Sequence, residues 1–423
     1  MVEKLISFSL KNRLFVLAVA LALFVWGVFE MKRNPIDAIP DLSENQVIVF
    51  TEWMGRSPQV IEDQITYPLM SNLQGIPKVK NIRGASMFGM SFVYLIFEDN
   101  ADVYWARTRV MERLNYASRL LPTGVSPTLG PDGTGVGHIF WYTLEAKDWD
   151  LGELRTLQDW YVKFALQNVN GVSEVASFGG QQKQYQVNIN PNKLNYYNIP
   201  LMQVLNAIRA NNNDVGGRKF EMSDIGYIVR GLGYYKSITD IENTVIANYN
   251  GSAVLVKDVA SVQLGGDLRL GIFDDNGTGE VVGGIIVMRY GENADAVIKR
   301  VKEKIKEVEK GLPKGVKFKV AYDRSGLIEE AIESVKGTLI EEMITVSIVV
   351  LIFLFHWRSA VIILIQMPIS IAISFILLNA FGLSSNIMSL TGIALAIGVI
   401  VDDGIVMVEN AYRHLSEAEN EKT

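Results

Sequence analysis

The chain has 423 residues, of which 49% are hydrophobic and 20% are charged, and its formal net charge is −6. This mixture predicts membrane-spanning segments joined to a large aqueous part, because it is too apolar for an ordinary soluble protein. The mild negative charge gives no indication of nucleic-acid binding. The absence of cysteine excludes disulfides and thiolate metal sites.

Four apolar runs are close to the ~20 residues that a membrane-spanning helix needs. The first lies within residues 1–33, and no small-residue cleavage site follows it, so an uncleaved span is predicted rather than a signal peptide. The other three lie at 337–356, 360–381 and 386–410. The flanking basic residues fall on one side if the spans alternate, and this side is predicted to be cytoplasmic: Lys4, Lys11, Arg13, Arg358 and Arg413.

The residues between the first two spans are expected outside, in the periplasm of a Gram-negative cell, and they contain an internal repeat. A strand, an amphipathic helix, a hairpin and a second helix are predicted between residues 46 and 121. Ninety residues after GIPKV…SMFG, which ends in Phe88 and Gly89, the pattern recurs as GVSEV…SFGG, with Phe178 and Gly179. Each copy is followed by a strand and a helix. Two β-α-β-β-α-β units are therefore predicted.

Residues 181–270 are richer in glycine and asparagine and contain short strands, so we expect them to form a subdomain inserted in the second unit. The resulting fold class is an α+β membrane protein with four transmembrane helices and one outer domain. The predicted boundaries are the N-terminus and first span at 1–33, the first unit at 34–125, the second unit at 126–180 and 271–336, the insert at 181–270, spans at 337–356, 360–381 and 386–410, and a cytoplasmic tail at 411–423.

Two adjacent acids interrupt the last apolar run. A carboxylate near the centre of a bilayer costs at least ~2.5–3.5 kcal/mol, which makes Asp402 a functional candidate, and Asp403 beside it favours sharing of one proton. Glu409 lies seven residues after Asp402 and Met388 lies fourteen before it, so the three share one helical stripe, whereas Asp403 points about 100° away. The alternative is that these acids only snorkel or hydrogen-bond to a neighbouring helix.

Methionine thioethers are soft ligands that select Cu(I) and Ag(I). Most of the 14 methionines occupy positions that suit core packing, and Met388 is the candidate metal ligand. The histidines at 138, 356 and 414 lack the spacing of a zinc site. Enzymatic motifs are not recognised: the glycines of GTGVG at 133–137 follow a Pro-Asp loop rather than a strand. No enzyme activity and no cofactor are expected.

Long strings of the sequence resemble the resistance–nodulation–division (RND) transporters, in particular the heavy-metal-efflux branch that includes copper and silver pumps. The strings are NPIDAIPDLSENQVIV, SMFGMSFVYLIFEDNADVYWARTRV, LGPDGTGVG, LRTLQDWYVKF, YDRSGLI and NIMSLTGIALAIGVIVDDGIVMVEN. The resemblance implies that the two units are porter subdomains and that the insert is a docking subdomain. It places Asp402 on the acid of the proton relay and Met388 on a methionine of the copper and silver pumps. Asp403 departs from that branch, as does Ile400, where a second methionine is usual.

The resemblance also implies an inner-membrane exporter driven by the proton-motive force, which carries Cu(I) or Ag(I). Its partners would be the metal ion, the proton, two further copies in a homotrimer, a periplasmic adaptor and an outer-membrane channel. Such pumps are built as two tandem halves, and this chain matches the first. It is interpreted as a fragment, a truncated gene product or one piece of a split pump. The alternatives are an exporter of amphiphilic organic compounds, which the paired acids favour, and a non-transporting assembly module.

Overall fold

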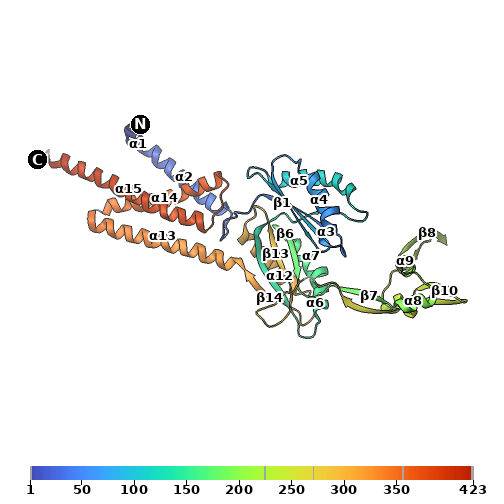
Figure 1. Cartoon of the computed structure of the whole chain (residues 1–423). Helices are drawn as coiled ribbons and strands as arrows, with labels where there is room; N and C mark the ends of the chain where they lie inside the picture. Colours follow the sequence, from blue (N-terminus) through green and yellow to red (C-terminus); the bar gives the residue numbers. More distant parts are fainter. Residues whose placement is uncertain (1, 223–224, 270, 355–356, 421–423) are drawn as a thin grey trace. The chain divides into compact units, whose positions relative to one another are not determined.

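The structure is a computed structural model, and it describes residues 2–222, 225–269, 271–354 and 357–420 (Figure 1). The chain divides into two compact units. The first contains Met1–Thr143, Val162–Ala176 and Gly284–Thr423, and the second contains Leu144–Tyr161 and Ser177–Gly283.

The first four-stranded sheet has the strand order β2-β3-β1-β4, with strands β1 (Gln46–Glu52), β2 (Val79–Met87), β3 (Met90–Phe97) and β4 (Thr128–Leu129). Strands β2 and β3 form the predicted hairpin, in which Met87 lies opposite Met90 and Gly89 adopts φ +70° in the turn. The alternating burial of β1 places Val47 and Val49 in the core. The central strands β1 and β3 are antiparallel, and the sheet buries one of its two faces.

The helices of this sheet begin at capping residues. Ser57 accepts a hydrogen bond from the Val60 backbone N–H, and Asp102 accepts one from Trp105 at 2.7 Å. The first helix runs through α3 (Pro58–Ile61), a π-helical turn η1 (Glu62–Thr66) and α4 (Tyr67–Leu73); the second runs through α5 (Val103–Ala117) and the 3₁₀ turn η2 (Ser118–Leu120). Their apolar faces pack on the sheet through fully buried residues that include Ile61, Ile65, Leu69, Leu73, Ala106 and Val110.

The second four-stranded sheet has the order β14-β5-β13-β6, with β5 (Gly133–Glu145), β6 (Val172–Phe178), β13 (Val282–Arg289) and β14 (Lys317–Asp323). Numbered within their own unit, the strands follow the order 4-1-3-2, which is also the order of the first sheet. Helices α6 (Leu151–Leu157), η3 (Gln158–Val162) and α7 (Lys163–Gln167) follow the first strand, and α12 (Ala294–Glu309) follows the third. The glycines of residues 133–137 begin strand β5.

Between β6 and β13 lies a long insertion, residues 179–281. Its first strand, β7 (Lys183–Ile189), pairs along its whole length with β12 (Ala260–Gly266). The insert continues through α8 (Pro191–Tyr197), α9 (Leu201–Asn211), β8 (Val215–Met222), β9 (Ile225–Gly231), α10 (Ile238–Glu242), β10 (Val245–Tyr249), β11 (Ser252–Leu255) and α11 (Val256–Val259). In the first unit β3 follows Gly89, and a corresponding strand is expected after Gly179. That strand, β7, is part of this ribbon. Strand β13 takes the place in the second sheet that β3 has in the first.

The remaining helices are α1 (Val2–Lys11), α2 (Arg13–Arg33), α13 (Arg324–Leu354), α14 (Trp357–Ala380) and α15 (Ile387–Asn420), and all but α1 contain long apolar stretches. Among the described residues, Arg13–Arg33 and Ile387–Ala411 are long and apolar enough to cross a membrane. Within α14, Ile365–Ala380 forms a shorter apolar stretch of helix. The second predicted span, 337–356, belongs to a helix that already begins at Arg324, and residues 355–356 lie outside the described chain.

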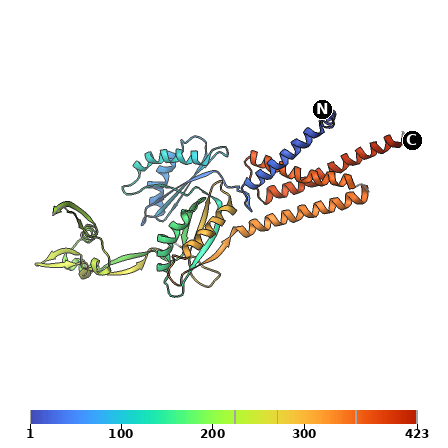
Figure 2. The ribbon, with the colours of Figure 1, turned by 180° about the vertical axis from the view of Figure 1, so that it is seen from behind.

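Helices α2 and α14 lie side by side in both views (Figures 1 and 2). A Cβ added to Gly27 of α2 would meet the Ala372 carbonyl oxygen at 2.2 Å, so the helix backbones are in close contact at this point. Glu30, one turn further along α2, is buried and accepts hydrogen bonds from Asn379 at 2.5 Å and from Trp26 at 3.0 Å. This pairing satisfies a carboxylate that the sequence analysis overlooked.

Candidate functional site

Helix α15 carries all four residues predicted from the sequence, and a local cap fixes its first turn. The Asn386 side chain accepts hydrogen bonds from the backbone N–H groups of Met388, at 3.0 Å, and Ser389, at 3.1 Å. The Ser389 hydroxyl in turn accepts the Asn386 N–H at 2.9 Å. These bonds satisfy donors that a helix N-terminus otherwise leaves free.

One face of α15 packs against its neighbouring helices. Ile397 and Val401 form a buried cluster with Met367 of α14. At Gly404, an added Cβ would come within 2.8 Å of the Gln366 side-chain oxygen, so glycine permits the close approach of α14. The helix therefore has a defined inner face, and this face does not contain Asp402.

The stripe predicted from helix geometry lies on the opposite, exposed face of α15. Met388 is 69% exposed, and Asp402 and Glu409 are also exposed, with Leu395 and Val406 between them. Asp403 is exposed as well. Within the described part of the chain, the Asp402 and Asp403 carboxylates have no hydrogen-bond or ion-pair partner.

The predicted metal ligand and the predicted acids do not form a single centre. Met388 and Asp402 are fourteen residues apart on one helix, which separates them by about 21 Å along its axis. In the described residues, no group of three or more His, Asp or Glu side chains is arranged to hold a metal ion.

A polar junction that the sequence analysis did not identify lies where the outer domain meets the apolar helices. Arg324, the first residue of α13, is only 4% exposed. Its Nη1 lies 3.2 Å from the Asp37 carboxylate, and its Nη2 donates to the His138 carbonyl oxygen of β5 at 2.9 Å. The adjacent Asp323 pairs with Lys302 of α12 at 2.5 Å. Arg324 thus links three segments that are distant in sequence.

The electrostatics of the junction favour the ionised form of Asp323. Burial alone would raise the pKa of Asp323, but hydrogen bonds from Lys302 and Ser325 outweigh it and hold this pKa below its ordinary value. Sequence strings containing Asp37 and Arg324 contributed to the family resemblance. Their pairing could not be read from the sequence because 287 residues separate them.

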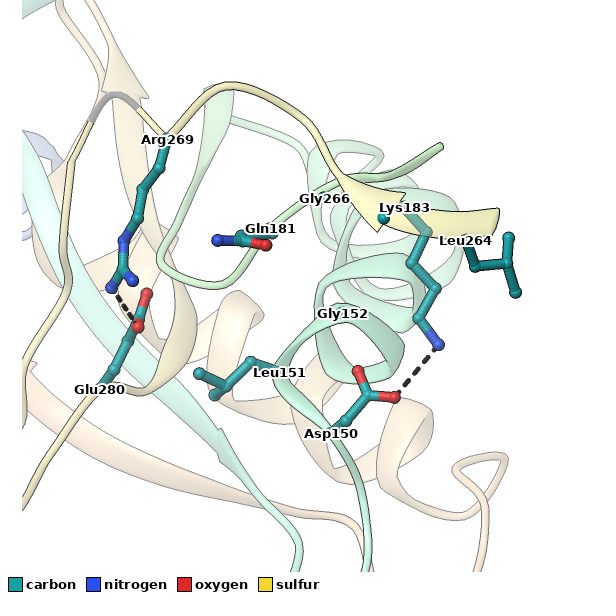
Figure 3. A pocket seen from close by; sticks show the side chains of 10 residues that line it. Asp150, Leu151, Gly152, Gln181, Lys183, Leu264, Gly266, Arg269 and Glu280 are labelled. Atoms are coloured by element: carbon teal, nitrogen blue, oxygen red, sulfur yellow. Dashed lines mark hydrogen bonds and ion pairs between the residues drawn. The ribbon is translucent and has the colours of Figure 1, made fainter. Parts of the chain in front are cut away.

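A cavity of about 510 Å³ lies in the second unit, at the base of the β7/β12 ribbon (Figure 3). Lys183 lies 3.2 Å from the Asp150 carboxylate on one side, and Arg269 pairs with Glu280 on the other. The backbone N–H of Glu153 donates to Asp150 and lowers its pKa, with Lys183 adding to the effect. Both cations have acidic partners, so the cavity lacks the uncompensated charge that an ionic ligand would need.

Comparison with known proteins identifies the architecture to which α15 and the two sheets belong. The sequence pattern of the AcrB/AcrD/AcrF family matches residues 5–423. The chain belongs to this family. A solved heavy-metal efflux pump (crystal form II) has the same fold over 97% of this chain and 41% of its own, with a TM-score of 0.86 and 36% identity. The RND fold predicted from the sequence is thus confirmed.

Other family members match over nearly the whole chain. It is 47% identical over 420 residues to a putative cation efflux system protein, SilA, of Salmonella typhimurium, and 46% identical to the cation efflux system protein CusA of Escherichia coli (strain K12). Identity to the cobalt-zinc-cadmium resistance protein CzcA of Cupriavidus metallidurans is 37%. Each match covers 99% of this chain and 40% of the relative, so the chain spans about two-fifths of their length.

Proposed function

We propose that the chain is the first half of an RND exporter that uses the proton-motive force to move heavy-metal ions out of the cell. The observation that carries this proposal is the identity of 46–47% with cation efflux system proteins over 99% of the chain. The acids of α15 add a physical reason, since a proton-driven exporter requires carboxyl groups within a membrane-spanning helix.

Monovalent copper or silver is the proposed substrate. Identity is higher to the SilA and CusA proteins than to the cobalt-zinc-cadmium protein, at 46–47% against 37%. The exposed thioether of Met388 suits a soft cation, and methionine binds without having to lose a proton. Export of amphiphilic compounds is the second candidate, and the paired acids Asp402 and Asp403 favour it.

Asp402 is the proposed proton-relay acid, with Asp403 and Glu409 as secondary members and Met388 as a metal contact. Asp402 lies on the exposed face of α15, away from the cluster around Met367. This face is the surface where helices of a second half would pack and supply the partner that the acid needs. The relay would then operate between the two halves of the pump.

The proposed architecture has four membrane helices and an outer domain of two porter subdomains, each with a ferredoxin-like (βαββαβ) fold. The shared strand order 4-1-3-2 supports this, as do the helices that follow the first and third strands of each unit. The proposed boundaries are those derived from the sequence, with residues 181–270 as the docking subdomain. The apolar helices suit a position in the inner membrane, with the outer domain in the periplasm.

A homotrimer that binds a periplasmic adaptor and an outer-membrane channel is the proposed assembly. The hairpin β8/β9 supports self-association, because every described residue in its strands is exposed, including Phe220, Ile225 and Ile228. A two-stranded hairpin is marginally stable by itself, so an apolar one gains stability from a partner surface.

Metal susceptibility tests the substrate. A strain lacking its own exporters would express this chain together with a second half and the envelope partners. We expect protection against silver or copper, and none against zinc, cobalt or detergents. Protection restricted to zinc would exclude the monovalent substrate, and protection restricted to dyes would favour the amphiphile exporter.

Proton flux tests the acids. In liposomes containing the same pump, Asp402→Asn should abolish metal-stimulated proton flux while trimer assembly persists, because the amide keeps the shape but cannot exchange a proton. Asp403→Asn is the matched control and should be milder, since Asp403 points about 100° off the stripe. Wild-type flux in Asp402→Asn would mean that the proton takes another route.

A further inference from the structure

We propose that Arg324 is a positioning residue that couples α15, the helix of Asp402, to the second four-stranded sheet. The inference rests on the proposed function, because it concerns how a proton step at Asp402 reaches the outer domain. The connection runs through Asp37 and through the short segment that precedes α15. It assigns a role to a buried ion pair that touches neither the metal nor the proton.

The guanidinium of Arg324 holds three segments together. Arg324 itself joins β14 to α13, its Nη2 donates to the His138 carbonyl of β5 at 2.9 Å, and its Nη1 lies 3.2 Å from Asp37. Arginine suits this position because its planar fork presents several donors in fixed directions. Lysine carries the same charge but lacks that fork. The two strands at one edge of the second sheet are thereby fixed to the segment that follows α2.

Asp37 continues the connection to α15. Its backbone N–H donates to the Ser385 carbonyl at 3.0 Å, and the Ser385 N–H donates to the Pro35 carbonyl at 2.9 Å. The buried Asn34 side chain adds a bond to the Ser385 hydroxyl at 2.9 Å. Ile36 and Ser385 form a parallel β-bridge, and the Ile387 N–H bonds to Ala38 at 3.3 Å. The segments 34–38 and 384–387 thus form one hydrogen-bonded unit that ends at the first residue of α15.

The alternative is that the Arg324–Asp37 ion pair only stabilises the fold. The position of the pair argues against this alternative. Arg324 is the first residue of α13, and Asp37 follows the C-terminal end of α2. The pair therefore lies where the chain passes between the sheets and the helices proposed to cross the membrane. The Arg324 and Asp37 side chains are only 5% and 16% exposed, so removing one partner leaves a poorly solvated charge. If α15 and the segments bonded to it move while β5 stays in place, the Arg324–Asp37 ion pair must break. The junction meets the physical requirement for coupling, which is an unbroken chain of contacts between the two elements.

The test uses the complete pump, with this chain and a second half, in liposomes. Arg324→Gln, Asp37→Asn and the double variant are compared by turnover of metal-stimulated proton flux, KM for the metal, equilibrium metal affinity and trimer size. We expect turnover to fall about tenfold or more, which is the factor that a typical coupling free energy produces. KM, metal affinity and trimer size should remain unchanged. The double variant should match the single ones because the pair acts as a unit. Arg324→Lys should retain an intermediate turnover.

Arg33→Gln is the matched control: it removes an exposed positive charge from the last turn of α2, where Arg33 lies over the Phe29 ring of the same helix. It should transport like the wild type. Unchanged turnover in Arg324→Gln would overturn the coupling role. Parallel losses of metal affinity, trimer and turnover would also overturn it and assign the pair to stability alone. A wild-type pump without metal-stimulated flux would instead reject the proposed function.

A second measurement applies if Arg324→Gln does not fold. The chain has no cysteine of its own, so Ile36→Cys and Ser385→Cys can be joined by a short bifunctional thiol reagent without background labelling of this chain. Because the two bridged segments are inferred to move together, the cross-linked pump should keep its flux. Inhibition by the cross-link, but not by the same reagent on either single variant, would show that the segments must separate and would reject the coupling unit.

Discussion

The two four-stranded sheets share a strand order but join their second and third strands differently. In the first sheet, β2 and β3 are adjacent in sequence, and Phe88 and Gly89 make the turn. In the second, about a hundred residues separate β6 from β13, and the chain leaves the sheet at Gly179. A covalent turn therefore holds the first pair of strands, whereas the second pair needs interactions between the two ends of the insertion.

Charged side chains supply these interactions. Arg155 of α6 donates to the Gly179 carbonyl at 2.8 Å and pairs with Asp159 at 2.7 Å. Glu280, just before β13, accepts the Gly180 N–H at 3.2 Å and pairs with Arg269. The comparison shows that the same sheet tolerates a large insertion when polar contacts replace the short turn.

The largest expected effect comes from Gly179→Ala. Gly179 has φ +74°, where a Cβ costs roughly 1–2 kcal/mol, and its Cβ would lie 1.8 Å from the Val281 carbonyl oxygen. At Gly89, with φ +70°, the nearest atoms would be the Met54 sulfur at 2.9 Å, which can move, and the Met54 Cα at 3.0 Å, a much milder contact than the one at Gly179. Hydrogen exchange of the whole chain in nanodiscs should show faster opening of β6 and β13 in Gly179→Ala than of β2 and β3 in Gly89→Ala.

Gly277→Ala is the control for backbone strain without a steric clash. Gly277 has φ +73°, like Gly179, but no atom lies within 4 Å of its added Cβ. It should leave the exchange of β6 unchanged. If Gly89→Ala and Gly179→Ala opened their strands equally, the proposed difference between a turn and an opened junction would be wrong.

A smaller effect is expected from Arg155→Met. This change keeps the length of the side chain but removes a charged hydrogen bond to the Gly179 carbonyl, worth ~1.5–3 kcal/mol. Protease cleavage near residues 179–182 should become faster, while cleavage in the β2/β3 turn should not change. Arg109→Met, which removes an exposed ion pair with Glu112 in the first unit, is the control and should cost under ~1 kcal/mol. Equal cleavage in wild type and Arg155→Met would show that the carbonyl contact does not hold the junction.

The smallest effect is the pH dependence of the cap at Asp150. Its pKa in the folded chain lies below the ordinary value of 3.8, so its stabilising contribution is present above about pH 4 and is lost as the pH falls through the lowered pKa. The protection of the amides in the first turn of α6, measured as their exchange rate relative to an unstructured peptide at the same pH, should therefore fall below pH 4, and Asp150→Asn should remove most of this dependence. An identical acid response in both proteins would contradict the role of Asp150.

Much of the fold could be predicted because its signals are local. Hydrophobic periodicity located the helices and strands, and the repeated Phe-Gly pair revealed the second unit. The partner of the strand after Gly179 could not be predicted, because β7 has a strand-like pattern whichever partner it takes, and pairing with β12 depends on residues far along the chain. The helical stripe of Met388, Asp402 and Glu409 followed from geometry alone. The Arg324–Asp37 pair did not, since nothing local to either residue indicates the other.

The β7/β12 ribbon has a mechanical consequence. Its seven residue pairs run from Lys183 and Gly266 at the base to Ile189 and Ala260 at the far end, so both strands enter the insert from the same side. A pull on the insert stretches both strands equally and does not slide one along the other, so tension is carried by covalent bonds and the hydrogen bonds stay unloaded. Two-stranded ribbons, however, twist readily. The ribbon should therefore behave as a tether that is stiff in extension and soft in torsion.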